Sequence, residues 1–238
     1  MSNASGTLHL ISVTLGDCDP HLALAPSALQ AACALDYFLA ENAKSARQFL
    51  KSIGHPRPLR DLQIESFDKD DNAGRATELL QPLLAGRSAG VVSEAGAPAV
   101  ADPGALLVTA AHRLQIRVAP HVGPSSILLA LMAAGFNGQR FAFHGYLPVP
   151  KDECRRVIAA RERESREHDM TQVFIETPYR NDQLLQTLIE VCAPATRLCI
   201  ASDLTLVSEA VHSVSIAEWK AGKFEIGRRP SVFLLYAR

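Results

Sequence analysis

The sequence predicts an α/β protein of two domains, a mostly parallel sheet followed by a mixed sheet. Three observations support this class. In the first half of the chain, short apolar runs rich in β-branched residues alternate with longer helical patterns, as expected when helices cover both faces of a parallel sheet. Two prolines and a glycine interrupt the chain at 120–124. Strand patterns then crowd toward the C-terminus, where antiparallel pairs are expected.

The first domain is predicted to span residues 7–119, with strands and helices in alternation. Each predicted strand is a short apolar run, and the helical patterns end near Gly54 and Gly86. Pro26 falls in the first turn of the first helix, a position that tolerates proline. The predicted strands are 8–13, 37–40, a short one around Ile64, 88–93 and 116–118, and the predicted helices are 27–35, 43–53, 73–84 and 105–113.

The second domain is predicted to span residues 120–238. It begins with an apolar helix, contains one strongly charged helix, and ends in a stretch where strands follow one another with only a short helix near Trp219. This order indicates a mixed sheet. The predicted helices are 125–134, 152–168 and 181–191, and the predicted strands are 140–145, 172–175, 197–201, 210–214 and 232–236.

Charge gives no support for binding nucleic acid. The chain carries 24 basic and 25 acidic side chains, for a formal net charge of −1. Proteins that hold nucleic acid through many phosphate contacts usually show a basic excess or a basic stripe. A local basic patch formed by folding stays open as an alternative.

Five cysteines occur, at 18, 33, 154, 192 and 199, and no Cys/His spacing predicts a metal site. They are expected to be free thiols in a reducing cytosol. No apolar run reaches the roughly 18 residues that span a membrane, and the N-terminus lacks a signal-peptide pattern. The chain is therefore expected in the cytoplasm, without a membrane partner or a bound metal.

Four loops rich in glycine, proline and small polar residues follow predicted strands. They are residues 14–17, 93–104, 123–126 and 176–180. In open α/β sheets, ligands bind beyond the carboxyl ends of the strands. These loops are therefore the predicted ligand-binding segments.

The 93–104 loop has two interpretations. Gly96 and Gly104 allow backbone to approach a ligand closely, and Glu94 and Asp102 add two carboxylates. The alternative is a strand-to-helix turn in which Asp102 caps the helix beginning at Ala105. The 123–126 and 176–180 loops carry the same ambiguity between a binding loop and a plain turn.

Several common site patterns are absent from the sequence. No GxGxxG follows the first strand, and neither a GxxxxGK[ST] phosphate loop nor a GxSxG nucleophile elbow occurs. An ordinary Rossmann nucleotide site is therefore unsupported. His144 stands at a strand end before Gly145, as either a site residue or a structural histidine.

Taken together, the loops resemble the tetrapyrrole methylase family over nearly the whole chain. The family's Ser-Asp-Ala-Gly-x-Pro-x-x-x-Asp-Pro-Gly loop is similar to residues 93–104, with Glu94 in place of aspartate. Its Pro-Gly-Pro-Ser, Arg-Phe-x-x-x-Gly-Phe-Leu-Pro and Glu-Ser-Pro-His-Arg motifs are similar to 122–125, 140–148 and 176–180. The resemblance is closest to the branch that methylates a ribose 2′-hydroxyl of bacterial 16S ribosomal RNA.

Three segments depart from that branch. The branch has Pro-Thr-Pro-Ile-Gly-Asn-Leu where this chain has residues 12–18, and Ala-Glu-Asp-Thr-Arg where it has residues 40–44. The Glu-Leu-Thr-Lys stretch of the branch corresponds to residues 203–206, with Leu206 in place of its lysine. These are substrate-side loops, whereas the cofactor loops persist. The resemblance therefore indicates the cofactor more firmly than the acceptor.

The resemblance implies two α/β domains with a cofactor cleft between them, the arrangement of class III methyltransferases, and a homodimer. It implies S-adenosylmethionine-dependent methyl transfer to a ribose of ribosomal RNA. Methylation of a small molecule or tetrapyrrole is the alternative, and a non-catalytic S-adenosylmethionine-binding module is a further one.

The site residues follow from the same resemblance. If the acceptor is a hydroxyl, a general base is needed; the candidates are Glu41, Glu94, His144 and Asp203. The predicted cofactor-binding residues are Leu15, Glu94, Ala95, Gly96, Ala97, Pro98, Ser125, Ser126, Ile127, Glu176, Thr177, Tyr179, Arg180 and Leu204.

Overall fold

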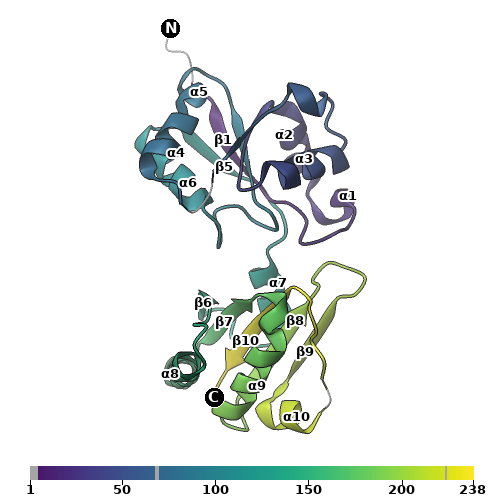
Figure 1. Cartoon of the computed structure of the whole chain (residues 1–238), viewed down its shortest axis with the longest axis vertical. Helices are drawn as coiled ribbons and strands as arrows, with labels where there is room; N and C mark the ends of the chain where they lie inside the picture. Colours follow the sequence, from purple (N-terminus) through teal and green to yellow (C-terminus); the bar gives the residue numbers. More distant parts are fainter. Residues whose placement is uncertain (1–4, 68–69, 223) are drawn as a thin grey trace. The chain divides into compact units, whose positions relative to one another are not determined.

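All ten predicted strands are present in the computed structural model, which describes residues 5–67, 70–222 and 224–238 (Figure 1). The chain separates into two units, residues 1–125 and 126–238. The sequence-based boundary, after residue 119, precedes this division. Each unit has its own five-stranded sheet, so each is described by itself.

The first unit has a parallel sheet in the order β3-β2-β4-β1-β5. Every neighbouring pair runs parallel, as the alternation of strands and helices predicts. All carboxyl ends therefore lie at one edge. The strands are β1 (Thr7–Ile11), β2 (Tyr37–Ala40), β3 (Gln63–Ser66), β4 (Ala89–Val92) and β5 (Arg117–Pro120).

Helices cover both faces of this sheet (Figure 1). Along β2, Tyr37 and Leu39 enter the core formed with α4 and α6, whereas Phe38 and Ala40 enter the core formed with α2 and α3. This alternation is the two-residue period of a strand buried on both sides. The helices are α1 (Pro20–Ala23), α2 (Pro26–Ala34), α3 (Ala43–Ser52), α4 (Ala73–Leu79), α5 (Gln81–Leu84) and α6 (Gly104–Arg113), with a 3₁₀ turn, η1 (Leu59–Asp61).

The helix predicted over 73–84 is two helices, because Pro82 interrupts it. Proline has no N–H to donate, and its ring clashes with the carbonyl four residues earlier. The N–H of Leu83 bonds instead to Leu80, and the carbonyl of Leu79 accepts a 2.9 Å hydrogen bond from the buried hydroxyl of Tyr37. The break therefore leaves this carbonyl satisfied.

The second unit has a mixed sheet in the order β6-β7-β10-β8-β9. β6 and β7 are parallel, and the other three pairs are antiparallel, which confirms the predicted mixed sheet. Because β7 and β8 both run opposite to β10, their carboxyl ends share one edge. The strands are β6 (Phe141–Tyr146), β7 (Thr171–Glu176), β8 (Arg197–Ser202), β9 (Ala210–Ser215) and β10 (Ser231–Tyr236).

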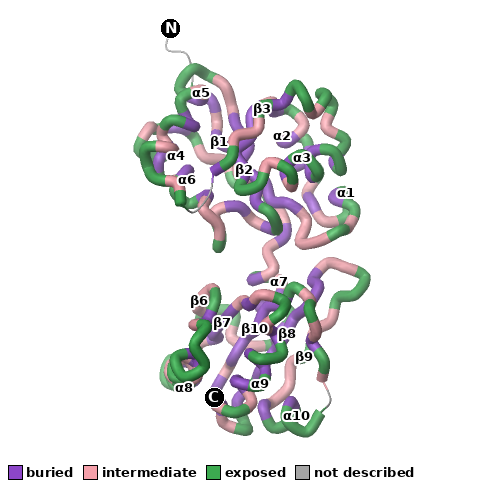
Figure 2. The backbone as a smooth tube through the Cα atoms, viewed as in Figure 1, coloured by how far each residue is buried: buried purple, intermediate pink, exposed green. Residues whose placement is uncertain are grey.

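Helices also cover this sheet. α8 (Lys151–His168), α9 (Asn181–Val191) and α10 (Ile216–Ala221) pack on the face that carries Phe174 and Phe233, and α7 (Ser126–Ala134) contacts β8, β9 and β10. A 3₁₀ turn, η2 (Pro178–Arg180), leads into α9. Burial concentrates in the central strands, whereas the outer side of α8 is exposed (Figure 2). Among the described residues, no helix combines the length and apolarity of a membrane span.

Candidate active site

Three of the four predicted loops meet at the carboxyl edge of the first unit's sheet. They follow β1, β4 and β5. The N–H of Val13 donates a 2.9 Å hydrogen bond to the carbonyl of Gly96, which joins the first loop to the 93–104 loop. Gly123 lies so close to Ser12 that a Cβ added to it would be 2.3 Å from the Ser12 Cβ. Only glycine fits there, and the third loop therefore packs against the first.

The 93–104 loop has an unusual backbone conformation. Gly96 has a φ of 73°, a left-handed conformation that suits glycine. Its carbonyl accepts a 3.0 Å hydrogen bond from the Ser93 hydroxyl. Ala99 and Ala101 also have positive φ, 65° and 62°, where a Cβ is disfavoured. Two alanines in strained conformations indicate a loop shape that the surrounding contacts impose.

Asp102 braces this loop from within. Its Oδ1 accepts hydrogen bonds from the N–H groups of Ala99, at 2.7 Å, and Gly104, at 2.8 Å. Burial nevertheless raises the pKa of the carboxyl above its ordinary value, against the lowering effect of these two bonds. The helix begins at Gly104, one residue before the predicted Ala105, and its N-cap residue is Pro103, while Asp102 braces the turn that leads into it. Ligand binding by the loop stays a prediction.

A cavity of about 240 Å³ opens beside these loops. Its walls are residues 13–18, which contain the first loop, the α3 residues Ser45, Gln48, Phe49 and Ser52, and the pair Ser93 and Glu94. The Ser45 hydroxyl donates a 3.4 Å hydrogen bond to Oε1 of Glu94. Ser45 and Gln48 were not among the predicted site residues, since only folding brings α3 beside the strand end at Ser93.

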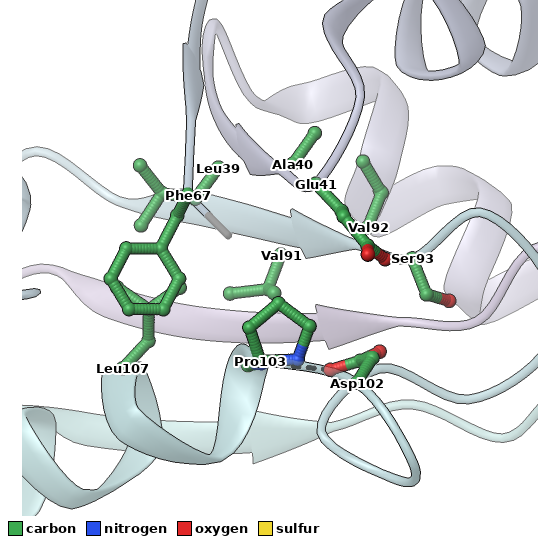
Figure 3. A pocket seen from close by; sticks show the side chains of 11 residues that line it. Leu39, Ala40, Glu41, Phe67, Val91, Val92, Ser93, Asp102, Pro103 and Leu107 are labelled. Carbon is green, nitrogen blue, oxygen red and sulfur yellow. Dashed lines mark hydrogen bonds between the residues drawn. The ribbon is translucent and has the colours of Figure 1, made fainter. Parts of the chain in front are cut away.

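A second cavity lies between the ends of β2 and β4 and the start of α6 (Figure 3). Glu41 and Asp102 contribute carboxylates to it, beside apolar side chains that include Phe67 and Leu107. Its volume is about 10 Å³, roughly what a single water requires. It is too small to hold an acceptor group.

At the carboxyl edge of the second unit's sheet, Glu176 and Arg180 form a buried ion pair. Arg180 Nη2 lies 3.1 Å from Glu176 Oε2, and the carboxylate side chain is only 1% exposed. Its Oε1 accepts bonds from the N–H and hydroxyl of Thr177. Tyr179, in contrast, is 72% exposed. Glu176 and Arg180 therefore hold the loop, while Tyr179 is available for contact.

Asn181 ties the same edge together. It is fully buried, and its Nδ2 donates to the carbonyls of Gly227, at 3.0 Å, and Arg229, at 2.7 Å. In the described part of the chain, neither its Oδ1 nor the buried Oγ1 of Thr205 has a hydrogen-bond partner. Asn181 directly follows the 176–180 motif and carries no sequence signal of its own, so it was not among the predicted site residues.

The candidate bases lie in different surroundings. Asp203 is buried, with Oδ2 3.9 Å from Nη1 of Arg229. His144 bonds through Nε2 to Oε1 of Gln172 and stacks on Phe174, as a structural histidine does. Glu41 lines the small cavity, and Glu94 lines the large one. Geometry therefore favours Glu94 as the carboxylate that can meet an acceptor.

The other predicted cofactor residues follow the same loops. In the first unit, Leu15 lines the large cavity, Ala95 is exposed and Pro98 is buried. Ser126 and Ile127 begin α7 in the second unit, and Leu204 is buried just after β8. Half-buried positions are occupied by Ala97, Ser125 and Thr177.

Comparison with known proteins decides the family. The sequence profile of the tetrapyrrole (corrin/porphyrin) methylases matches residues 8–220, which is most of the chain. The chain belongs to this family. Use of S-adenosylmethionine is a general property of these enzymes, and the chain is accordingly an S-adenosylmethionine-dependent methyltransferase.

Relatives within the family carry a more specific name. The chain is 32% identical over 212 residues to ribosomal RNA small subunit methyltransferase I of Xylella fastidiosa, covering 89% of this chain and 73% of the relative. The enzyme of the same name from Pseudomonas aeruginosa is 29% identical over 215 residues, covering 90% and 72%.

Solved structures of family methyltransferases share the fold. The methyltransferase CobJ superposes with a TM-score of 0.64 at 20% identity, covering 98% of this chain and 95% of CobJ. Uroporphyrin-III-C-methyltransferase from Thermus thermophilus gives a TM-score of 0.55 at 18% identity, covering 97% and 92%. At these identities the likeness concerns the fold, which confirms the predicted class of two α/β units.

Proposed function

We propose that this enzyme transfers a methyl group from S-adenosylmethionine to a ribose 2′-hydroxyl of small-subunit ribosomal RNA. The supporting observation is the similarity to relatives named ribosomal RNA small subunit methyltransferase I over about nine-tenths of the chain. Tetrapyrrole methyltransferases are similar to the chain at 18–20% identity, which concerns the fold alone.

The two sheet edges fit the chemistry of the methyl donor. Adenosine and an amino-acid group need hydrogen-bond and stacking partners, and the second unit presents the exposed Tyr179 at one edge, beside the buried Asn181 and its unpartnered Oδ1. The first unit presents the backbone between Glu94 and Ala97, shaped by Gly96. We propose that these segments bind the donor, together with the predicted residues of the 123–127 and 176–180 loops. Its placement between the two units stays a prediction.

The donor supplies a methyl group already activated on a sulfonium. The protein's task is therefore to align the acceptor oxygen, keep water away and accept a proton. The braced 93–104 loop suits alignment, because Asp102 fixes its backbone from within. A braced loop keeps the acceptor oxygen in line with the methyl group, and small displacements from that line would slow methyl transfer.

Two further parts of the proposal concern location and assembly. Methylation of ribosomal RNA places the enzyme in the cytoplasm. We also propose a homodimer, as expected for the family. Light scattering on the purified protein tests this; a mass of about 51 kDa, twice the 25.7 kDa of one chain, is expected, and a monomer at micromolar concentration contradicts it.

Two measurements test the function itself. Calorimetry should detect S-adenosylmethionine and S-adenosylhomocysteine at micromolar concentration, and absence of both would overturn donor binding. Mass spectrometry of ribosomal RNA from a deletion strain should reveal a lost ribose methyl group that the purified enzyme restores. Unchanged ribose methylation would remove the RNA proposal. Donor binding without turnover on ribosomal RNA, on uroporphyrinogen or on small molecules would indicate a binding module.

A further inference from the structure

The large cavity of the first unit has the size of one small group. Its volume of about 240 Å³ lies below the roughly 300–1,000 Å³ of sites that enclose a drug-sized ligand. This size favours a single group over a whole macrocycle. A single sugar or nucleoside that protrudes from a larger acceptor can.

The lining of this cavity suits hydroxyl-bearing groups. Hydroxyls come from Thr14, Ser45 and Ser52, and an amide comes from Gln48. Asp17 and Glu94 add carboxylates, and none of the described lining residues is lysine or arginine. An anionic group inside the cavity, whether a tetrapyrrole carboxylate or an RNA phosphate, would meet like charge, which disfavours binding. A neutral sugar or nucleoside would find both donors and acceptors.

Glu94 is the carboxylate best placed to act in this cavity. It stands two residues after β4 ends, opposite α3, and its Oε1 accepts the hydrogen bond from Ser45. In the described part of the chain, Oε2 has no hydrogen-bond partner. Ser45 lies in the first turn of α3, which begins after the N-cap Asn42. One oxygen is therefore oriented by a helix-borne hydroxyl, while the other has no partner within a side chain that lines the cavity.

We infer that this cavity binds the hydroxyl-bearing acceptor group, and that Glu94, oriented by Ser45, takes the acceptor's proton. The inference rests on the proposed function and specifies its acceptor side. The acceptor oxygen bonds to the methyl carbon as the bond from that carbon to sulfur breaks. The hydroxyl proton passes to the Glu94 carboxylate and then to water, and the sulfonium becomes a neutral thioether. Glu94 is thus the catalytic residue, and Ser45 is a positioning residue.

Single substitutions test the two roles. Under saturating donor, Glu94→Gln should lower kcat on ribosomal RNA from the deletion strain by about 10²–10⁴-fold, the usual contribution of a general base. The KM for that RNA and the calorimetric Kd for S-adenosylhomocysteine should change less than about threefold. Loss of a general base lowers kcat without weakening binding, whereas loss of a binding contact would raise KM or Kd. Glu94→Asp, which restores the aspartate of the family motif, should recover most of kcat.

Ser45→Ala should lower kcat by about threefold to tenfold, the effect of one lost hydrogen bond, without changing donor affinity. The matched control is Glu153→Gln, on the exposed side of α8, which should retain wild-type kcat. Wild-type kcat in Glu94→Gln would overturn the inference. So would a loss of donor affinity that accounts for the loss of rate, since Glu94 would then be a donor ligand.

A binding experiment separates this inference from the proposed function. In amide NMR spectra of the full chain with S-adenosylhomocysteine, a free ribonucleoside at millimolar concentration should shift residues 14–18 and 45–52, whereas uroporphyrin should not. Those shifts without methylation of ribosomal RNA would contradict the proposed RNA substrate and leave the acceptor cavity standing. Methylation of RNA without shifts at these residues, or shifts with uroporphyrin, would overturn the cavity assignment.

Discussion

The two sheet edges that carry the candidate site are stabilised in opposite ways. In the first unit, the 93–104 loop relies on a backbone hydrogen bond from Val13 and on one bracing aspartate, and it carries two alanines in the left-handed region. In the second unit, the edge relies on buried polar side chains, with the Glu176–Arg180 pair and the Asn181 amide at its centre. The first edge has a carboxylate, Glu94, in the lining of a cavity. At the second edge, Glu176 and Arg180 neutralise each other in an ion pair.

The two edges should therefore respond differently to substitution. Truncating a side chain of the second edge leaves a buried polar group unpaired, which costs free energy of unfolding. Changes in the first loop should alter local strain and charge at a smaller cost, because the 93–104 loop is partly exposed. Effects on the free energy of unfolding should therefore be largest at the second edge and smaller in the 93–104 loop.

The largest effect is expected from Arg180→Ala. It leaves the carboxylate of Glu176, 1% exposed, without its counter-ion, and should lower the free energy of unfolding by about 3–5 kcal/mol. Urea denaturation measures this. The matched control, Arg163→Ala, removes an exposed ion pair with Glu167 and should cost no more than about 1 kcal/mol. Equal losses in the two variants would contradict the importance of burial.

Asn181→Ala should have the next largest effect. It removes the donor shared by the carbonyls of Gly227 and Arg229 and leaves these half-buried carbonyls without that partner, at a cost of about 1–3 kcal/mol. Urea denaturation of the variant and the wild type gives the difference. Gln183→Ala, on the exposed side of α9, is the control and should match the wild type. If the free energy of unfolding falls no more than in the control, the Asn181 amide does not stabilise this edge.

Ala101→Gly should have a smaller effect of the opposite sign. A left-handed non-glycine residue costs about 1–2 kcal/mol, and glycine loses about 0.5–1 kcal/mol more entropy on folding. The variant should therefore be more stable than the wild type by up to about 1 kcal/mol. The same change at Ala159, exposed in the middle of α8, should destabilise by about 1 kcal/mol. Loss of stability at both positions would exclude strain at Ala101.

The smallest effect concerns the pH dependence of Asp102. Burial raises the pKa of its carboxyl above 3.8, so the folded state binds more protons than the unfolded state just above that pH. Its contribution to stability is thus present below the unfolded pKa and is lost as pH rises through the folded pKa. Asp102→Asn keeps an acceptor oxygen without the charge.

Denaturant midpoints measured across this window test the sign. The stability of Asp102→Asn relative to the wild type should rise as pH increases through the folded pKa of Asp102. The control, Asp61→Asn at an exposed position, should show no such rise. A relative stability that falls with pH would mean that the two N–H bonds outweigh burial.

Local patterns determined the order of elements along the chain. The strand at 37–40 and the helix at 181–191 have the bounds that the sequence predicts, because apolar periodicity is a local property. The same patterns placed four loops after strands, and three of them meet in the first unit. The missed break at Pro82 was also local. A continuous apolar face extended the helical prediction past a residue that cannot donate to the helix.

Contacts between distant residues could not be read from such patterns. Ser45 and Glu94 are 49 positions apart, and His144 and Gln172 are 28 apart. Whether a carboxylate becomes an internal brace, as Asp102 does, a buried ion-pair partner, as Glu176 does, or an open group, as Glu94 does, depends on which side chains folding brings beside it.

The sequence by itself therefore determined the fold class, the family resemblance and the loops that carry the chemistry, since these depend on residue type and spacing. Only the tertiary structure separated residues that hold the loops from residues that face the cavity. The physical reason is burial, because the cost of an unpaired charge is set by the solvent and partners around it, and those exist only after the sheets have formed.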